Sequence, residues 1–294
     1  MQAIIMFAIS MAIFGSIGLF SEKTALPSIE LVFVRCLCAT VLLGAILIFQ
    51  LVKNTESPVS KVPRREYGLA LLCGVFLVTN WVFFFRSIEV MPITVAVSIY
   101  HLAPVMVLVL GSFLFKEKLT ILGAVFFFVC FFGTLLVGGI HQHTSFTAFL
   151  STGVMWAFLA ALFYALTSLT GKGIQALNPL STTVIQTSLG ILLLAPFVDW
   201  TNFTALTLEN WIYILITGFI HTGLVFYLFF RSLRQLPAQT IALLVFIDPI
   251  VAILLDVSVL HYRPDLYQIL GIILVFVGIS YSPQKEKRMK KQAA

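Results

Sequence analysis

The sequence consists of long apolar stretches separated by short polar segments. Each stretch holds roughly 18 or more mostly apolar residues, the length at which a helix rising about 1.5 Å per residue crosses about 30 Å of hydrocarbon. Ten transmembrane helices are predicted, over residues 3–20, 29–51, 66–86, 92–115, 119–138, 149–171, 180–199, 209–231, 237–260 and 264–282. No basic segment precedes the first stretch, which we interpret as a retained helix and not as a cleaved signal peptide. The pattern predicts an all-α polytopic membrane protein.

Composition agrees with this fold class. Of the 294 residues 60% are hydrophobic and only 10% are charged, whereas soluble domains carry roughly a quarter charged residues. An ordinary water-soluble protein is therefore excluded. All four cysteines fall inside predicted helices, and we interpret them as buried small apolar side chains without a disulfide or a metal. They are Cys36, Cys38, Cys73 and Cys130.

The distribution of Lys and Arg predicts the orientation. If the amino terminus is inside, 14 of the 18 basic residues lie in inner segments, five of them in a basic tail at 283–294. Only Lys23, Arg86 and Arg263 lie in outer segments, and Arg35 lies within a helix. Because basic residues are retained on the cytoplasmic side, both termini are predicted to be cytoplasmic, in a plasma or inner membrane. The net charge of +6 is thus a topology signal, and no nucleic-acid partner is predicted.

The chain contains an internal repeat. Residues 84–92 read FFRSIEVMP and residues 229–237 read FFRSLRQLP, and at the same offset of 145 Pro104 falls on Pro249. The two copies end the third and the eighth predicted helices. Because five helices per repeat is an odd number, the second repeat is inserted upside down. This predicts two inverted five-helix repeats, 1–138 and 149–282, joined by an outer loop at 139–148.

Inverted repeats are typical of secondary transporters, in which two halves expose one central site to either side in turn. The alternative interpretation is an ancient duplication retained for packing. Since the two repeats together would form a complete site, a monomer would suffice.

Several loose motifs together resemble one transporter family. Residues 95–133 hold a mid-helix proline, then an acidic residue at the helix end, then a glycine-rich helix, and the second half is similar. The chain as a whole resembles EamA-type members of the drug/metabolite transporter superfamily. The residues that carry the resemblance are Pro104, Glu117, Gly123 and Gly133, then Asp248, Pro249, Gly271 and Gly278, together with Arg35, Lys23 and Lys172.

This resemblance implies ten helices, cytoplasmic termini and traffic of small metabolites, often amino acids leaving the cell. One position departs from the pattern, because Tyr262 stands in the second half where Glu117 stands in the first and where many relatives repeat the glutamate. Glu117 then serves this role in the first repeat alone, or Asp265 takes the role in the second repeat.

Ionisable residues inside the helices are candidates for the substrate site, since each costs roughly 2.5–3.5 kcal/mol to insert. Asp248 precedes Pro249 within the ninth helix, where it could bind substrate or a proton, or serve as a structural carboxylate. Arg35 could reach the headgroups or pair with Asp248, and we favour these two interpretations. The alternative is that Arg35 holds a substrate carboxylate bidentately. Pro104 and Pro249 would supply the bends on which the halves move.

Further polar side chains complete the predicted site. His101 and His221 lie in mid-helix and could relay protons, although a satisfied neutral histidine is the more common case. Tyr100, Asn80 and Tyr164 need hydrogen-bond partners in a dry medium, so we expect them to line the substrate pathway. His141 and His143, in an outer loop, are too few to predict a metal and are interpreted as solvated.

Together these features predict an alternating-access secondary transporter that exports amino acids or related compounds, with the lipid bilayer as its surroundings and protons as a possible coupling ion. Proton-coupled multidrug efflux and, less favoured, an intramembrane enzyme are the alternatives. The sequence lacks a GxxxxGK[ST] loop and the HExxH and GxSxG motifs, so no cofactor and no enzymatic activity are predicted.

Overall fold

A computed structural model describes residues 2–53, 62–103, 106–107, 110–111, 121–137, 139, 141, 153–171, 173–233, 244 and 247–279. All secondary structure within these ranges is helical. The principal elements are α1 (Gln2–Glu22), α2 (Ser28–Val52), α3 (Arg64–Val90), α4 (Ile93–Tyr100), α6 (Ile121–Val137), α8 (Met155–Gly171), α9 (Pro179–Leu194), α10 (Leu208–Leu215), the π-helix η5 (Ile216–Leu224), α11 (Val225–Leu233), α13 (Ile247–Val259) and α14 (Leu266–Ile279). Two short 3₁₀ turns, η3 (Ala195–Phe197) and η4 (Trp200–Phe203), follow α9.

Five helical stretches in the described part of the chain are long and apolar enough to cross a membrane. They are Gln2–Glu22, Ser28–Gln50, Arg64–Val90, Pro179–Phe197 and Leu208–Phe229. Shorter apolar helices cover Met155–Gly171 and Leu266–Val277. These stretches coincide with seven of the ten predicted helices, so the chain is an integral membrane protein of several apolar helices.

The fourth predicted helix, 92–115, departs most from the expectation. Its first part, α4, ends at Tyr100, and a turn follows at residues 101–102. Residues 103, 106–107 and 110–111 are helical again, and the Met106 amide donates to the Leu102 carbonyl at 3.0 Å. Pro104 lies outside the described residues.

Helix ends coincide with the polar segments of the sequence. Pro92 precedes α4, and Asn178 caps α9 by accepting a hydrogen bond from the Leu180 amide at 3.0 Å. Thr207 and Asn210 form a capping box at the start of α10. Such caps satisfy amide groups that have no partner within their own helix.

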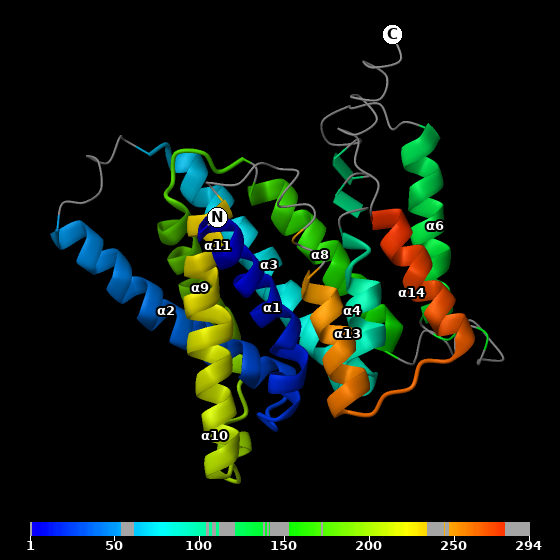
Figure 1. Cartoon of the computed structure of the whole chain (residues 1–294). Coiled ribbons are helices and arrows are strands. Elements are labelled where there is room, and N and C mark those ends of the chain that lie inside the picture. The colour runs from blue at the N-terminus through cyan, green and yellow to red at the C-terminus, as the bar shows by residue number, and fades with distance from the viewer. Residues whose placement is uncertain are drawn as a thin grey trace.

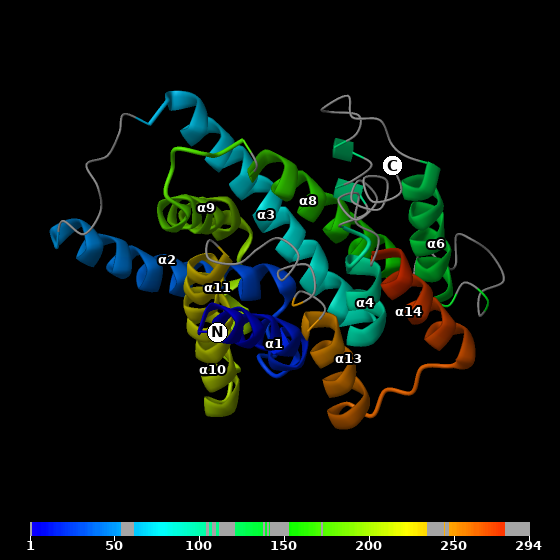
Figure 2. The same cartoon turned by 45° about the horizontal axis from the view of Figure 1, so that its top comes forward.

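The helices pack as one bundle (Figures 1 and 2). In it α3 packs against α8 and α9, α2 against α9 and η5, and α1 against α13 and α11. Both views place α6 and α14 side by side at the edge of the bundle far from the carboxyl end of α2. The latter pair is in backbone contact, because a Cβ on Gly133 would lie 2.8 Å from the Gly271 carbonyl oxygen, and one on Gly271 would lie 2.7 Å from that of Gly133.

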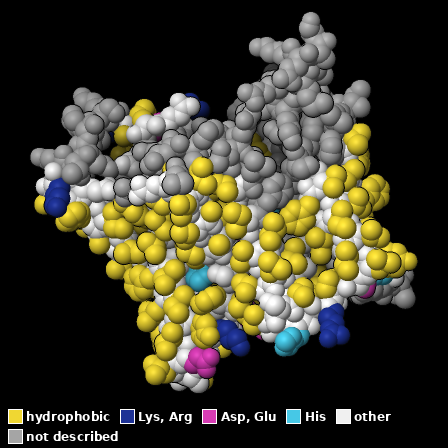
Figure 3. Space-filling model, viewed as in Figure 1, with side chains coloured by type: hydrophobic (Ala, Val, Ile, Leu, Met, Phe, Trp, Pro, Cys, Tyr) yellow, Lys and Arg dark blue, Asp and Glu magenta, His cyan; other side chains and the backbone are white. Residues whose placement is uncertain are grey.

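Apolar side chains occupy both the interior and the exterior. Hydrophobic residues cover most of the described surface in Figure 3, and the charged side chains visible there lie at its margins. An exterior of this kind suits contact with lipid. Cys36, Cys38 and Cys73 are buried and free, as expected from the sequence, whereas the side chain of Cys130 lies outside the described part.

Candidate functional site

A buried arginine lies where α2, α3 and η5 meet. Arg35 is 2% exposed, and its guanidinium carbon lies 4.8 Å from the ring centroid of Trp81 and 4.6 Å from that of Phe85. Its Nε donates a hydrogen bond to Thr222 Oγ1 at 2.9 Å. Its Nη1 has no hydrogen-bond partner among the described residues.

This environment corrects two expectations for Arg35. Its side chain does not extend toward headgroups, because aromatic faces and a hydroxyl enclose it within the bundle. Nor does it form an ion pair with Asp248 in the described structure. Cation–π contacts give partial compensation to a desolvated guanidinium, but they leave Nη1 without an acceptor.

Three of the predicted polar residues meet where α3, α4 and α8 pack together. Tyr100 at the end of α4 donates its hydroxyl to Asn80 Oδ1 on α3 at 3.3 Å, and its ring lies 5.5 Å from that of Tyr164 on α8. Asn80 in turn donates to the Ala160 carbonyl of α8 at 2.6 Å. Packing thus brings together residues that are separated by up to 84 positions in the sequence.

Asp248, near the described start of α13, is half-buried. It makes no hydrogen bond or ion pair with the residues that the structure describes. The phenol of Tyr100 is within electrostatic range of both Asp248 and Arg35, and that of Tyr164 is within range of Asp248. Tyr100 therefore lies near both a carboxylate and the buried cation, and Tyr164 lies near the carboxylate.

The two mid-helix histidines have different surroundings. His221 in η5 is buried, with Nε2 2.9 Å from Ser16 Oγ and its ring 4.7 Å from that of Phe20. His101 caps α4, where Nδ1 donates to the Val97 carbonyl at 2.7 Å. His101 is thus satisfied within its own helix, and His221 is held by α1.

The predicted hinges are described only in part. Pro249 is buried in α13, and Pro104 lies outside the described residues. Their role in movement stays a prediction.

Asp256 on α13 was missed by the sequence reasoning. It is 2% exposed, and its Oδ2 accepts a hydrogen bond from the Thr94 amide in the first turn of α4 at 2.6 Å. This bond ties α4 to α13, which are far apart in the chain. An aspartate inside a predicted membrane span was the available signal, and nothing in the sequence indicated its partner.

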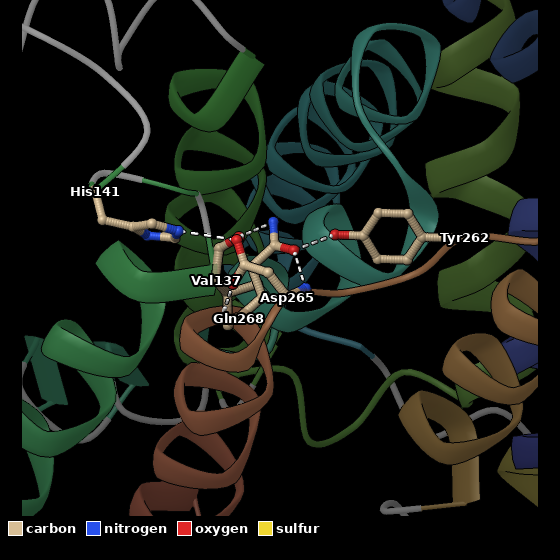
Figure 4. A network of polar contacts seen from close by, with 5 residues as sticks. All are labelled: Val137, His141, Tyr262, Asp265 and Gln268. Carbon is tan, nitrogen blue, oxygen red and sulfur yellow. Dashed lines mark hydrogen bonds and ion pairs between the residues drawn. The ribbon is translucent and has the colours of Figure 1, made fainter.

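A polar network joins the end of α6 to the start of α14 (Figure 4). Asp265 accepts from the Gln268 amide at 2.8 Å and lies 2.9 Å from His141 Nε2. Tyr262 donates its hydroxyl to Gln268 Oε1 at 2.9 Å, and Gln268 Nε2 donates to the Val137 carbonyl at 3.4 Å. Tyr262 and Asp265, the two residues left in question by the missing glutamate, therefore take part in one interhelical contact.

The pKa of Tyr262 reflects its burial in this interhelical contact. Burial raises the pKa of Tyr262 to about 12, with smaller contributions from the carboxylates of Asp256 and Asp265. His141 is exposed, as its interpretation as a solvated residue expected, and its Nε2 also lies 2.9 Å from Asp265 Oδ2. His143 lies outside the described residues, and the described part of the chain contains no group of three or more His, Cys, Asp or Glu side chains that could hold a metal ion.

Apolar helices around a buried cation, a carboxylate and polar aromatic residues define a polytopic membrane protein with an internal polar site. Comparison with known proteins gives the class. The EamA-like transporter family matches residues 1–139 and 151–282. The chain belongs to this family, of the drug/metabolite transporter superfamily, and is thereby a member of a membrane transporter family, as the sequence motifs predicted.

One relative agrees with this assignment, and one solved structure shares the fold. An uncharacterized transporter of Bacillus subtilis (strain 168), YxxF, is 51% identical over 278 residues, which cover 95% of this chain and 88% of that protein. A protein of known crystal structure has the same fold, with a TM-score of 0.66 over 98% of both chains at 16% identity.

Proposed function

We propose that this protein is an alternating-access secondary transporter of amino acids or related small metabolites, which it exports across the plasma or inner membrane. One observation carries the proposal. Arg35 is a buried cation whose Nη1 has no partner among the described residues, and an ionisable group within a membrane protein, being costly to bury, typically marks a functional site. A small anionic group on the substrate would complete its hydrogen bonding.

The packing of the helices supports ten helices arranged as two inverted repeats. At the offset of 145 residues α1 corresponds to α8, α2 to α9, α3 to the α10–η5–α11 helix, and α6 to α14. Contacts occur in corresponding pairs: α1 packs on α11 as α8 packs on α3, α2 packs on η5 as α9 packs on α3, and α6 packs on its own counterpart α14. This pairing is expected of a two-fold relation, under which both termini lie in the cytoplasm and a monomer holds both halves of the site.

The charges around Tyr100 favour a zwitterionic substrate. Arg35 would donate hydrogen bonds to the carboxylate, Asp248 would hold the ammonium group, and Tyr100, Asn80 and Tyr164 would lie between them. Opposite charges placed this way bind an amino acid in one orientation and compensate each other's desolvation. Because Asp248 has no partner in the described structure, it is also the proposed proton-binding residue.

The function is tested first by comparing extracellular metabolites of cells that lack the protein and cells that overproduce it. Accumulation of amino acids outside the overproducing cells is expected. Loss of amino acids from the medium would show that the protein imports them. An unchanged medium would count against transport of amino acids.

The site is tested with purified protein in liposomes, by counterflow of a ¹⁴C-labelled mixture of the proteinogenic L-amino acids. Arg35→Lys is expected to raise the half-saturating concentration by about tenfold or more, because an ammonium lacks the planar fork of a guanidinium. An unchanged value would remove Arg35 from the site. Gly44→Ala is the matched control on α2, where an added Cβ meets nothing within 4 Å.

A further inference from the structure

The residue that holds Arg35 lies in an unusual turn of helix. Residues Ile216–Leu224 form a π-helix within an otherwise α-helical stretch that runs from Leu208 to Leu233. Short π-helical segments are rare and are frequent at functional sites. None of the sequence motifs predicted it.

The π-helix changes which residues share a face. In an α-helix with 3.6 residues per turn, positions five apart lie about 140° apart around the axis. Here Gly218 and Gly223 both pack on α2: a Cβ on the first would lie 2.6 Å from Cys38 Cβ, and one on the second would lie 2.6 Å from Leu42 Cδ2. The wider turn thus aligns positions five apart along α2, the helix that bears Arg35.

Thr222 lies between these two glycines in the sequence and is fully buried. Its hydroxyl donates to the Thr217 carbonyl, five residues earlier, at 3.0 Å. A hydroxyl has one hydrogen and two lone pairs, so once this hydrogen is committed, the oxygen is an acceptor for Arg35 Nε at 2.9 Å. The π-helical backbone therefore takes up the hydrogen of this hydroxyl and leaves its oxygen as an acceptor for Arg35.

This bond determines the direction in which the guanidinium points. The rings of Trp81 and Phe85 contact the guanidinium group and restrict its position. A ring face attracts the cation without selecting one N–H, so it leaves rotation within the guanidinium plane free. The hydrogen bond from Nε to Thr222 selects one rotation, in which Nη1 has no partner among the described residues.

We infer that Thr222 is a positioning residue, and that the π-helix holds it so that the free edge of Arg35 faces the substrate carboxylate. The inference rests on the proposed function, because it assumes that Arg35 binds the substrate. Thr222 itself then selects for a carboxylate without touching it.

Thr217 provides a matched control. It lies in the same π-helix, is also fully buried, and its hydroxyl has no hydrogen-bond partner among the described residues. Thr217→Val and Thr222→Val remove the same atoms from the same helix. Only the second removes the acceptor for Arg35.

The experiment is counterflow in liposomes with the ¹⁴C-labelled mixture of proteinogenic L-amino acids, with the unlabelled amino acids and their methyl esters as competitors. Thr222→Val is expected to raise the half-saturating concentration about tenfold, with a smaller change in maximal rate. It should also reduce the preference for free acids over esters. Thr222→Ser should restore both values to within about twofold, and Thr217→Val should behave as the unmodified protein. Thr222→Cys, whose sulfur is a weak acceptor, replaces the valine variant if that variant does not fold.

The outcomes separate this inference from the proposed function. If Arg35→Lys weakens transport and Thr222→Val matches Thr217→Val, Thr222 has no positioning role while the proposed function stands. If Arg35→Lys leaves the half-saturating concentration unchanged, or no amino acid is transported, both are overturned.

Discussion

The hydrogen bond between Asp256 and the Thr94 amide gives the sharpest prediction about stability. Both residues are almost completely buried, and the bond joins α13 to α4. A hydrogen bond to a charged group contributes about 1.5–3 kcal/mol, and a buried donor left without an acceptor costs about 1–3 kcal/mol. We expect Asp256→Ala to destabilise the protein by about 2–3 kcal/mol. Asp256→Asn, whose amide oxygen remains an acceptor, should cost about 1 kcal/mol.

The assay can use the chain's own cysteines. Cys36, Cys38 and Cys73 are buried and free, so a thiol-reactive dye labels them only as the protein unfolds. At about 2–4 °C per kcal/mol, the scale for large domains, Asp256→Ala should lower the midpoint in detergent by about 4–12 °C. Ser258→Ala, at an exposed position of the same helix, is the control and should shift it by no more than about 1 °C. Equal midpoints for Asp256→Ala and Ser258→Ala would refute the bond's role in joining the helices.

Three further predictions concern other contacts. Gly133→Ala should lower the unfolding midpoint, since the new Cβ would lie 2.8 Å from the Gly271 carbonyl oxygen and overpacking costs about 1–3 kcal/mol; Gly44→Ala, where the Cβ meets nothing, should not lower it. Because the pKa of Tyr262 is raised from 10.0 to about 12, the folded state keeps this proton when the unfolded state loses it, so stability is full below about pH 10 and falls as the pH rises toward 12. Tyr262→Phe should flatten that fall in alkaline unfolding curves, and an identical curve would contradict the pKa. Asp248→Asn should abolish transport driven by a pH gradient but leave counterflow exchange measurable, at a raised half-saturating concentration because the ammonium group loses its counter-charge. Transport that is still driven by a pH gradient in this variant would exclude Asp248 as the proton site.

Much of the helical layout could be predicted from the sequence. A membrane-spanning helix satisfies its own backbone, so it is recognised from its own length and apolarity without knowledge of its neighbours. The stretches α1, α2, α3 and α9 therefore lie close to where the hydropathy pattern placed them. Resemblance to the EamA family depended on motifs spread along the whole chain, and the family match confirmed it.

Predictions about the site were less complete. Tyr100, Asn80 and Tyr164 do meet: Asn80 is fully buried and bonded to Tyr100, and the Tyr100 ring contacts that of Tyr164, which is 40% exposed. A polar side chain in a dry medium needs such a partner, which is why these residues could be predicted. The expectation that Arg35 reaches the headgroups or pairs with Asp248 was wrong, since a long flexible side chain has several favourable environments and sequence does not rank them.

What the sequence by itself determined is the class of protein, the position of most helices and the set of polar residues that must avoid lipid. Only the tertiary structure decided the partners: the two rings and the hydroxyl around Arg35, the π-helical turn that presents Thr222, and the bond from Asp256 to α4. The physical reason is a difference in range. Apolar length and composition act within one helix and are visible in consecutive residues, whereas a hydrogen bond or a cation–π contact depends on which helices pack and in which rotation, and that is settled by the whole bundle at once.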